Sequence, residues 1–231
     1  MIARNPVPNT IDLSNHQPFA SGYNRQCFRH PENPSLCLKI LRPENIEARF
    51  HRQSFPKKLL GKRRIDDNAQ ELRAHQQQAI RRLISQGQAE TVWRHLPRFH
   101  GSVQTSLGTA NVSELLQDEH NRPAETLEQY LQRQRFDHPM QEAVERFCDW
   151  LQNTGILTRN LLPHNLVVVE RANQPELYLV DGLGAPTIPG KLAIITAWRR
   201  RYIGRRIQRF YLRIEWELSD RPQSWEQSQK L

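Results

Sequence analysis

Residues 155–169 read GILTRNLLPHNLVVV and residues 177–184 read LYLVDGLG, and these two stretches decide the fold. The first follows a helical pattern that runs from about Met140 to Asn153, and it ends in a run of β-branched residues. The second begins with another short apolar run, and turn residues at 173–175 separate the two runs. The sequence therefore predicts a helix, a polar loop, a β-hairpin and a second polar loop, in that order.

Three polar residues in these loops have the spacing of a kinase catalytic centre. In a kinase, a loop acid orients the acceptor hydroxyl, an Asn five residues later ligates magnesium, and an Asp after a hairpin bridges the metal at the nucleotide phosphates. Asn165 lies five residues after Asn160, and Asp181 lies sixteen residues after Asn165. Since magnesium prefers oxygen ligands, Asn165 and Asp181 are candidate metal ligands.

The position of the catalytic acid is occupied by Asn160. A neutral amide cannot accept the hydroxyl proton, although it can still form hydrogen bonds and orient an acceptor. General-base catalysis contributes roughly 10²–10⁴-fold, whereas phosphoryl transfer depends mainly on positioning and charge stabilisation. We therefore expect a pseudokinase or a weak kinase. The alternatives are an active small-molecule or sugar phosphotransferase and a basic membrane- or nucleic-acid-binding module in which the nucleotide cleft is vestigial.

A second group of candidate residues lies upstream, on a strand and on the helix that follows. Leu36–Leu41 is a compact apolar strand that contains Lys39, and a buried lysine is costly unless it is paired. Glu71, on a helix expected from about Ala69 to Gly87, is the natural partner; the alternative is that both side chains face water. A strand Lys paired with a helix Glu holds the phosphates of ATP in kinases. The expected apolar stripe of this helix includes Glu71, Leu72, His75, Ala79, Ile80 and Leu83.

The candidate phosphate-covering turn lies at Ser21 and Gly22, between two short strands within Phe19–Phe28. It lacks the GxGxxG pattern, so its backbone amides are expected to hold phosphate less closely. Asn24 and Arg25 are candidates to compensate through their side chains.

The order of elements predicts an α+β, two-lobed fold, with an antiparallel sheet in the N-lobe and a mostly helical C-lobe. We expect a flexible lead at 1–15, the N-lobe at 16–113 and the C-lobe at 114–231. Leu96–Val103 and Thr109–Leu116 are expected to pair as antiparallel strands. The hinge near Glu114 and Leu116 would then offer backbone groups to adenine.

The chain of 231 residues has a net charge of +9, which favours acidic partners such as nucleotides, anionic lipids or nucleic acid. No apolar run approaches the roughly 20 residues that cross a bilayer, and the first ten residues have no apolar core, so we expect a cytoplasmic protein. Cys27, Cys37 and Cys148 are expected to be free thiols.

A basic helix is expected at Ala193–Leu218. It either packs an apolar face into the C-lobe or docks on an anionic membrane or partner, while no motif for sequence-specific nucleic-acid binding is visible. A second basic cluster at Lys57–Arg64 adds to the docking surface only if it lies on the same side. The apolar positions are Ile203, Ile207, Phe210 and Ile214, and the basic positions are Arg199, Arg200, Arg201, Arg205, Arg206, Arg209 and Arg213.

The chain resembles the YrbL family, small kinase-like bacterial proteins associated with the PhoP regulatory network. The phrase His30-Pro31-Glu32 before a Cys-Leu-Lys strand is the most family-like detail. The resemblance implies a compact two-lobed kinase fold and, as a hypothesis, ATP and magnesium as cofactors. It spans roughly residues 16 to 210, and the matching stretches are residues 22–41, 96–116, 155–169 and 177–184.

Overall fold

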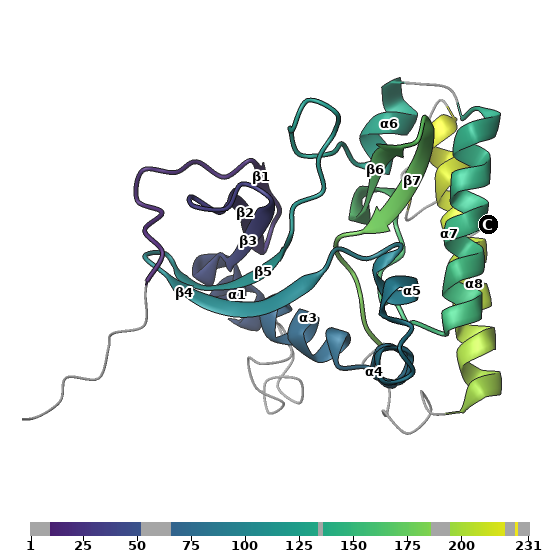
Figure 1. Ribbon diagram of the computed structural model, residues 1–231, viewed down its shortest axis with the longest axis horizontal. Helices are drawn as coiled ribbons and strands as arrows, with labels where there is room; N and C mark the ends of the chain where they lie inside the picture. Colours follow the sequence, from purple (N-terminus) through teal and green to yellow (C-terminus); the bar gives the residue numbers. More distant parts are fainter. Residues whose placement is uncertain (1–9, 52–65, 134–135, 186–194, 220–224, 226–231) are drawn as a thin grey trace, which may run out of the picture. The chain divides into compact units, whose positions relative to one another are not determined.

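The chain folds into two compact units in a computed structural model (Figure 1). Unit 1 comprises Met1–Arg73 and Arg98–Leu115, and unit 2 comprises Ala74–Pro97 and Leu116–Leu231. By packing, residues 74–97 thus belong with the later part of the chain, and the boundary near Glu114 expected from sequence stays a prediction. Part of the expected flexible lead and the cluster Lys57–Arg64 lie outside the described residues. The structure describes residues 10–51, 66–133, 136–185, 195–219 and 225.

Among the described residues of unit 1, five strands form one antiparallel sheet in the order β1-β2-β3-β5-β4 (Figure 1). This confirms the expected N-lobe sheet and places β3 at its centre. The bounds of β3 agree with the apolar run read from the sequence. The strands are β1 Ala20–Ser21, β2 Arg25–Arg29, β3 Leu36–Leu41, β4 Phe99–Thr105 and β5 Gly108–Glu114.

The two faces of this sheet differ in chemistry because successive side chains of a strand point to opposite sides. Phe28, Leu38 and Val112 are aligned across three strands and form the apolar core of unit 1. One residue along, Lys39 lies between Cys27 and Asn111 on the opposite face. The central strand therefore carries a lysine on a face that is buried but polar.

Helix α3, Asp67–His75, supplies the side chains that meet this polar face, and α1, Pro43–His51, precedes it in the chain. Its start was correctly expected near Ala69, whose amide donates to the Asp66 carboxylate at 2.8 Å, as at a helix N-cap. The expectation of one continuous helix to Gly87 is wrong.

The chain leaves α3 after His75 and begins α4, Gln78–Ser85, three residues later. Within unit 2, the side chain of Gln77 explains the break. It donates to the Ala74 carbonyl at 3.0 Å and accepts from the Leu157 amide at 2.7 Å, which fixes a non-helical turn. Leu72 is 39% exposed, so it does not belong to the expected apolar stripe.

Unit 2 packs helices around the predicted β-hairpin. Thr126 and Gln129 exchange hydrogen bonds as a capping box, which fixes the start of α6. The elements are α5 Ala89–Trp93, α6 Leu127–Arg133, α7 His138–Thr154, the 3₁₀ turn η2 Pro163–Asn165, β6 Leu166–Arg171, β7 Gln174–Leu179 and α8 Thr196–Leu218.

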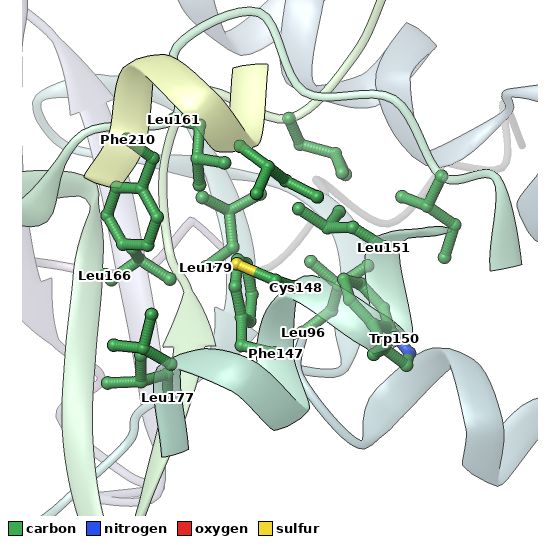
Figure 2. Close-up of a cluster of buried hydrophobic side chains, with 14 of the residues drawn as sticks. Leu96, Phe147, Cys148, Trp150, Leu151, Leu161, Leu166, Leu177, Leu179 and Phe210 are labelled. Atoms are coloured by element: carbon green, nitrogen blue, oxygen red, sulfur yellow. The ribbon is translucent and has the colours of Figure 1, made fainter. Parts of the chain in front are cut away.

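The core of unit 2 lies between α7, α8 and the hairpin. One cluster of buried side chains contains Phe147 and Leu151 of α7, Leu166 and Leu177 of the hairpin and Phe210 of α8, and all five are essentially inaccessible to solvent (Figure 2). Burying such side chains stabilises the fold by roughly 1.5–3 kcal/mol each. This packing holds the loops on either side of the hairpin in place.

The α+β class is confirmed, with an antiparallel sheet in one unit and a mainly helical second unit. No helix within the described part of the chain combines the length and apolarity needed to cross a membrane.

Candidate functional site

The predicted pairing of Lys39 with Glu71 is present in unit 1. Lys39 Nζ of β3 lies 2.7 Å from Glu71 Oε1 of α3, and the two residues are 6% and 8% exposed. The apolar strand β3 places Lys39 at the centre of the sheet, and helix α3 places Glu71 against the face on which Lys39 lies. The alternative in which both side chains face water is therefore wrong.

Arg25 is a second cation at the same carboxylate, and the sequence did not suggest it as a partner of Glu71. Its Nη1 lies 2.7 Å from Glu71 Oε2, and Arg25 is 7% exposed. The strand period supplies part of the signal once the register is known, because Arg25 lies two residues before Cys27, which is aligned with Lys39. Residues two apart on a strand share a face, so Arg25 had to lie on the side of Lys39.

The electrostatics of this cluster favour the charged form of Glu71. Burial alone would raise the pKa of its carboxyl, but Lys39 and Arg25, with a hydrogen bond from Asn111, outweigh burial and lower the pKa to about 2. Asn111 Nδ2 donates to Glu71 Oε2 at 3.0 Å, and Asn68 Nδ2 donates to the Lys39 carbonyl at 2.9 Å. The cluster is fixed by α3 and by β5 as well as by its ion pairs.

The expected catalytic loop of unit 2 is joined to the second loop by backbone hydrogen bonds. Asn165 Nδ2 donates to the Asn160 carbonyl at 2.8 Å, and the amide of Val180 donates to the Asn165 carbonyl at 2.9 Å. Asp181 follows directly, and its Oδ1 accepts from the Gly182 amide at 2.6 Å. The structure thus brings Asn160, Asn165 and Asp181 together, as their spacing predicted.

Gly182 is a residue that sequence reasoning left out of the site. Its φ is +80°, and a Cβ at this position would lie 2.5 Å from the backbone oxygen of Asn160. Its carbonyl accepts from the amide of Arg159 at 2.7 Å and from Thr158 Oγ1 at 2.8 Å. Only glycine combines this conformation with so close an approach to the Asn160 backbone. The Asp181-Gly182 pair in the sequence therefore indicates this tight loop contact as well as a candidate metal ligand.

The Ser21-Gly22 turn closes the β1–β2 hairpin. The amide of Gly22 donates to the Arg25 carbonyl at 2.8 Å. This hydrogen bond uses the backbone N–H that was expected to face phosphate. Asn24, expected to compensate through its side chain, donates from Nδ2 to Asp67 Oδ2 at 2.7 Å. The turn is therefore anchored to α3.

The backbone at the expected hinge is largely engaged within each unit. In unit 1 the amide of Glu114 donates to the Arg98 carbonyl at 2.8 Å. In unit 2 the Leu116 carbonyl accepts from the Ala124 amide at 3.0 Å. The role of Glu114 and Leu116 toward adenine stays a prediction.

The basic helix α8 presents its arginines in two ways. Its apolar positions at 203, 207, 210 and 214 are buried. That face therefore belongs to the core, which confirms the expectation that the helix packs an apolar face into the C-lobe. Arg206 lies over the ring of Tyr202, and Arg213 pairs with the buried Glu217 at 2.6 Å. Arg199 is half-buried and donates to Thr196 Oγ1 at 3.4 Å. The arginines exposed to solvent are Arg200, Arg201, Arg205 and Arg209.

Comparison with solved structures finds protein kinase domains. The kinase domain of PknI from Mycobacterium tuberculosis, in a single-substitution variant, is similar with a TM-score of 0.38 and 15% identity over 73% of this chain. The chain spans 59% of that kinase domain. A double-substitution variant of the same domain gives a TM-score of 0.38 at 14% identity, covering 75% of this chain and 63% of that one.

Comparison of sequences identifies the family. Uncharacterized proteins called YrbL from Escherichia coli (strain K12) and from Shigella flexneri are each 26% identical over 183 residues. Each match covers 77% of this chain and 75% of the relative. The profile of the family described as PhoP regulatory network protein YrbL matches residues 11–218. The chain belongs to this YrbL family.

Proposed function

We propose that the protein is a kinase-like regulatory protein that binds ATP with magnesium and acts as a pseudokinase or weak kinase. The observation that carries this proposal is the buried ion pair of Lys39 and Glu71. Burying a lysine and a glutamate costs several kcal/mol, so a strand–helix pair at this place indicates a role in ligand binding rather than in stability alone. The regulatory role rests on the family, whose description names the PhoP network.

In this proposal Lys39 contacts phosphate oxygens and Glu71 orients it. An ion pair with a helix carboxylate keeps the lysine ammonium in position when no ligand is bound. This lowers the entropic cost of ordering the lysine side chain on binding.

Asn165 and Asp181 are the proposed magnesium ligands, and their chemistry fits that role. The NH₂ group of Asn165 is committed to the Asn160 carbonyl, so its amide oxygen is the atom left for a cation. Asp181 supplies a carboxylate on the adjoining backbone. Magnesium, when bound, neutralises charge on the phosphates.

Asn160 makes the proposed protein a poor catalyst. It is exposed, and its amide cannot take a proton from an acceptor hydroxyl. Loss of a general base costs roughly 10²–10⁴-fold in rate. Transfer to a sugar or other small-molecule acceptor at ordinary kinase rates would instead identify an active phosphotransferase.

The test is a thermal-shift titration with ATP and magnesium on wild type, Lys39→Met and Asp181→Asn. We expect stabilisation of the wild type that falls in both variants. Asp149→Asn on the exposed side of α7 is the matched control for Asp181→Asn, because it makes the same change from carboxylate to amide in unit 2. The absence of any ATP-dependent shift in wild type would refute the proposal.

A second candidate function is docking of α8 on an anionic surface. The observation that favours it is the set of four exposed arginines, with no acidic residue between Trp198 and Ile214. Each arginine near an anionic lipid surface contributes about 1 kcal/mol. Arg201→Gln with Arg205→Gln should weaken vesicle binding at low salt, and Arg81→Gln with Arg94→Gln, also exposed, should not. Equal binding of both double variants would refute this role.

A further inference from the structure

We propose that Cys27 and Cys37 form a site of reversible oxidative modification, at which a peroxide joins the two thiols in one disulfide. This inference goes beyond the proposed function and does not depend on nucleotide binding. Both residues belong to the sheet of unit 1, Cys27 on β2 and Cys37 on β3, and both are reduced in the structure. They are ten positions apart in the chain, so it is the β2–β3 hairpin that brings them together.

The register of β2 against β3 places the two cysteine side chains on the same face of the sheet. Cys27 is aligned with Lys39, and Cys37 lies two residues before Lys39 on the same strand. Because side chains on a strand alternate between the two faces, Cys37 shares the face of Lys39 and lies diagonally across from Cys27. The two thiols meet in this position, since a hydrogen bond joins Cys37 to Cys27.

The surroundings of the two thiols assign them different parts in the reaction. Cys27 is half-buried, so a small oxidant can reach it, whereas Cys37 is 4% exposed. The hydrogen bond with Cys27 and burial together raise the pKa of the Cys37 thiol well above its usual value, so Cys37 keeps its proton. Cys27 is therefore the thiol that reacts with the oxidant, and Cys37 is the neighbouring thiol that resolves the product.

The reaction balances with hydrogen peroxide as the oxidant. The Cys27 sulfur attacks one peroxide oxygen, the O–O bond breaks, and the other oxygen leaves with the Cys27 proton as water, which gives a sulfenic acid. The Cys37 sulfur then attacks the sulfenic sulfur, the S–S bond forms, and the hydroxyl leaves with the Cys37 proton as a second water. Two thiols and one peroxide thus give one disulfide and two waters, and two electrons pass from sulfur to oxygen.

The geometry also predicts that the bond is readily reduced. The Cα atoms of diagonal partners on neighbouring antiparallel strands are roughly 7–8 Å apart, whereas those of a relaxed disulfide are about 4.4–6.8 Å apart. Closing the bond therefore draws β2 and β3 together beside Lys39 and stores strain, and strained disulfides are the more easily reduced ones. The bridge closes a short loop, which constrains the unfolded chain little. We therefore expect a reversible bond rather than a structural one.

The experiment treats the full chain with hydrogen peroxide, blocks the remaining thiols with N-ethylmaleimide in urea, and maps the tryptic peptides of the monomer band from a non-reducing gel by mass spectrometry. Trypsin separates the two cysteines, because it cleaves so that Cys27 lies in peptide 26–29 and Cys37 in peptide 30–39. Within a single chain, only the disulfide links these two peptides. Cys148→Ser is the matched control, since it removes the third cysteine, which is buried in unit 2.

We expect the linked pair of peptides in wild type and in Cys148→Ser alike, and its disappearance on treatment with dithiothreitol. The oxidised wild-type chain should carry one maleimide, on Cys148, whereas the reduced chain carries one on each of its three cysteines. Cys37→Ser should stop at the sulfenic acid of Cys27, which dimedone labels in peptide 26–29. In the native, reduced protein, limiting N-ethylmaleimide should alkylate Cys27 before Cys37.

Three results on the wild-type chain would overturn the inference, and none of them depends on the folding of a variant. The first is maleimide on both Cys27 and Cys37 after peroxide treatment. The second is oxidation of Cys27 to a sulfinic acid without the linked pair. The third is a disulfide that joins either residue to Cys148 or to a second chain in place of the linked pair. Alkylation of Cys37 before Cys27 would overturn the order of the two steps.

Discussion

Replacing Glu71 with Gln removes the carboxylate that Arg25 and Lys39 share, while the side chain keeps its shape. The two cations, each 2.7 Å from a carboxylate oxygen in the wild type, would then face a neutral amide. The lowering of the Glu71 pKa from 4.5 to about 2 corresponds to about 3 kcal/mol of stabilisation at neutral pH. Breaking a buried pair by removing one partner costs a similar amount, roughly 3–5 kcal/mol.

The pH dependence has a definite sign. The folded-state pKa of Glu71 lies below its unfolded value, so its stabilisation is complete above about pH 4.5 and is lost as the pH falls toward 2. Glu71→Gln has no such proton to bind. The gap in unfolding free energy between wild type and variant should therefore be about 3 kcal/mol at pH 7 and should narrow as the pH falls from 4.5 to 3.

The assay is urea unfolding at a series of pH values, with Glu32→Gln in the exposed turn before β3 as the matched control. Glu32→Gln should stay within about 0.5 kcal/mol of wild type. If Glu71→Gln were as stable as wild type at pH 7, or if the gap did not depend on pH, the cluster could not be the charged network described above.

Gly182→Ala should lower the free energy of unfolding in urea more than Gly87→Ala does. Both glycines have positive φ, but a Cβ at 182 would lie 2.5 Å from a backbone oxygen, whereas a Cβ at 87 meets nothing within 4 Å. Equal losses would show that the close approach is relieved without cost. Phe210→Ala should destabilise unit 2 by about 3–5 kcal/mol and the exposed Leu212→Ala by less than about 0.5 kcal/mol, measured the same way; similar values would contradict the packing of α8. Asp66→Ala should cost about 1 kcal/mol through loss of the α3 N-cap, and no change in the unfolding midpoint would argue against that cap.

Patterns local to the chain predicted most of the elements. The strand Leu36–Leu41 is apolar from end to end, and the β6–β7 hairpin is marked by two β-branched runs around a turn, so both follow from sequence alone. The capping residues of α3 and α6 likewise indicate where those helices begin.

What the sequence did not predict depends on contacts between distant residues. The break between α3 and α4 is fixed by a hydrogen bond from the Leu157 amide to the side chain of Gln77, eighty residues away in the chain, which no helix propensity encodes. The pairing of Arg25 with Glu71 depends on the register of β2 against β3 and on the position of α3, neither of which is visible in the sequence.

The central claim, that the buried Lys39 serves a nucleotide, is tested most directly by equilibrium dialysis of radiolabelled ATP with magnesium against wild type and Lys39→Met. We predict saturable binding at one site per wild-type chain, weakened at least roughly tenfold in a folded Lys39→Met. Equal retention of ATP by the two proteins, or no retention by wild type, would contradict it.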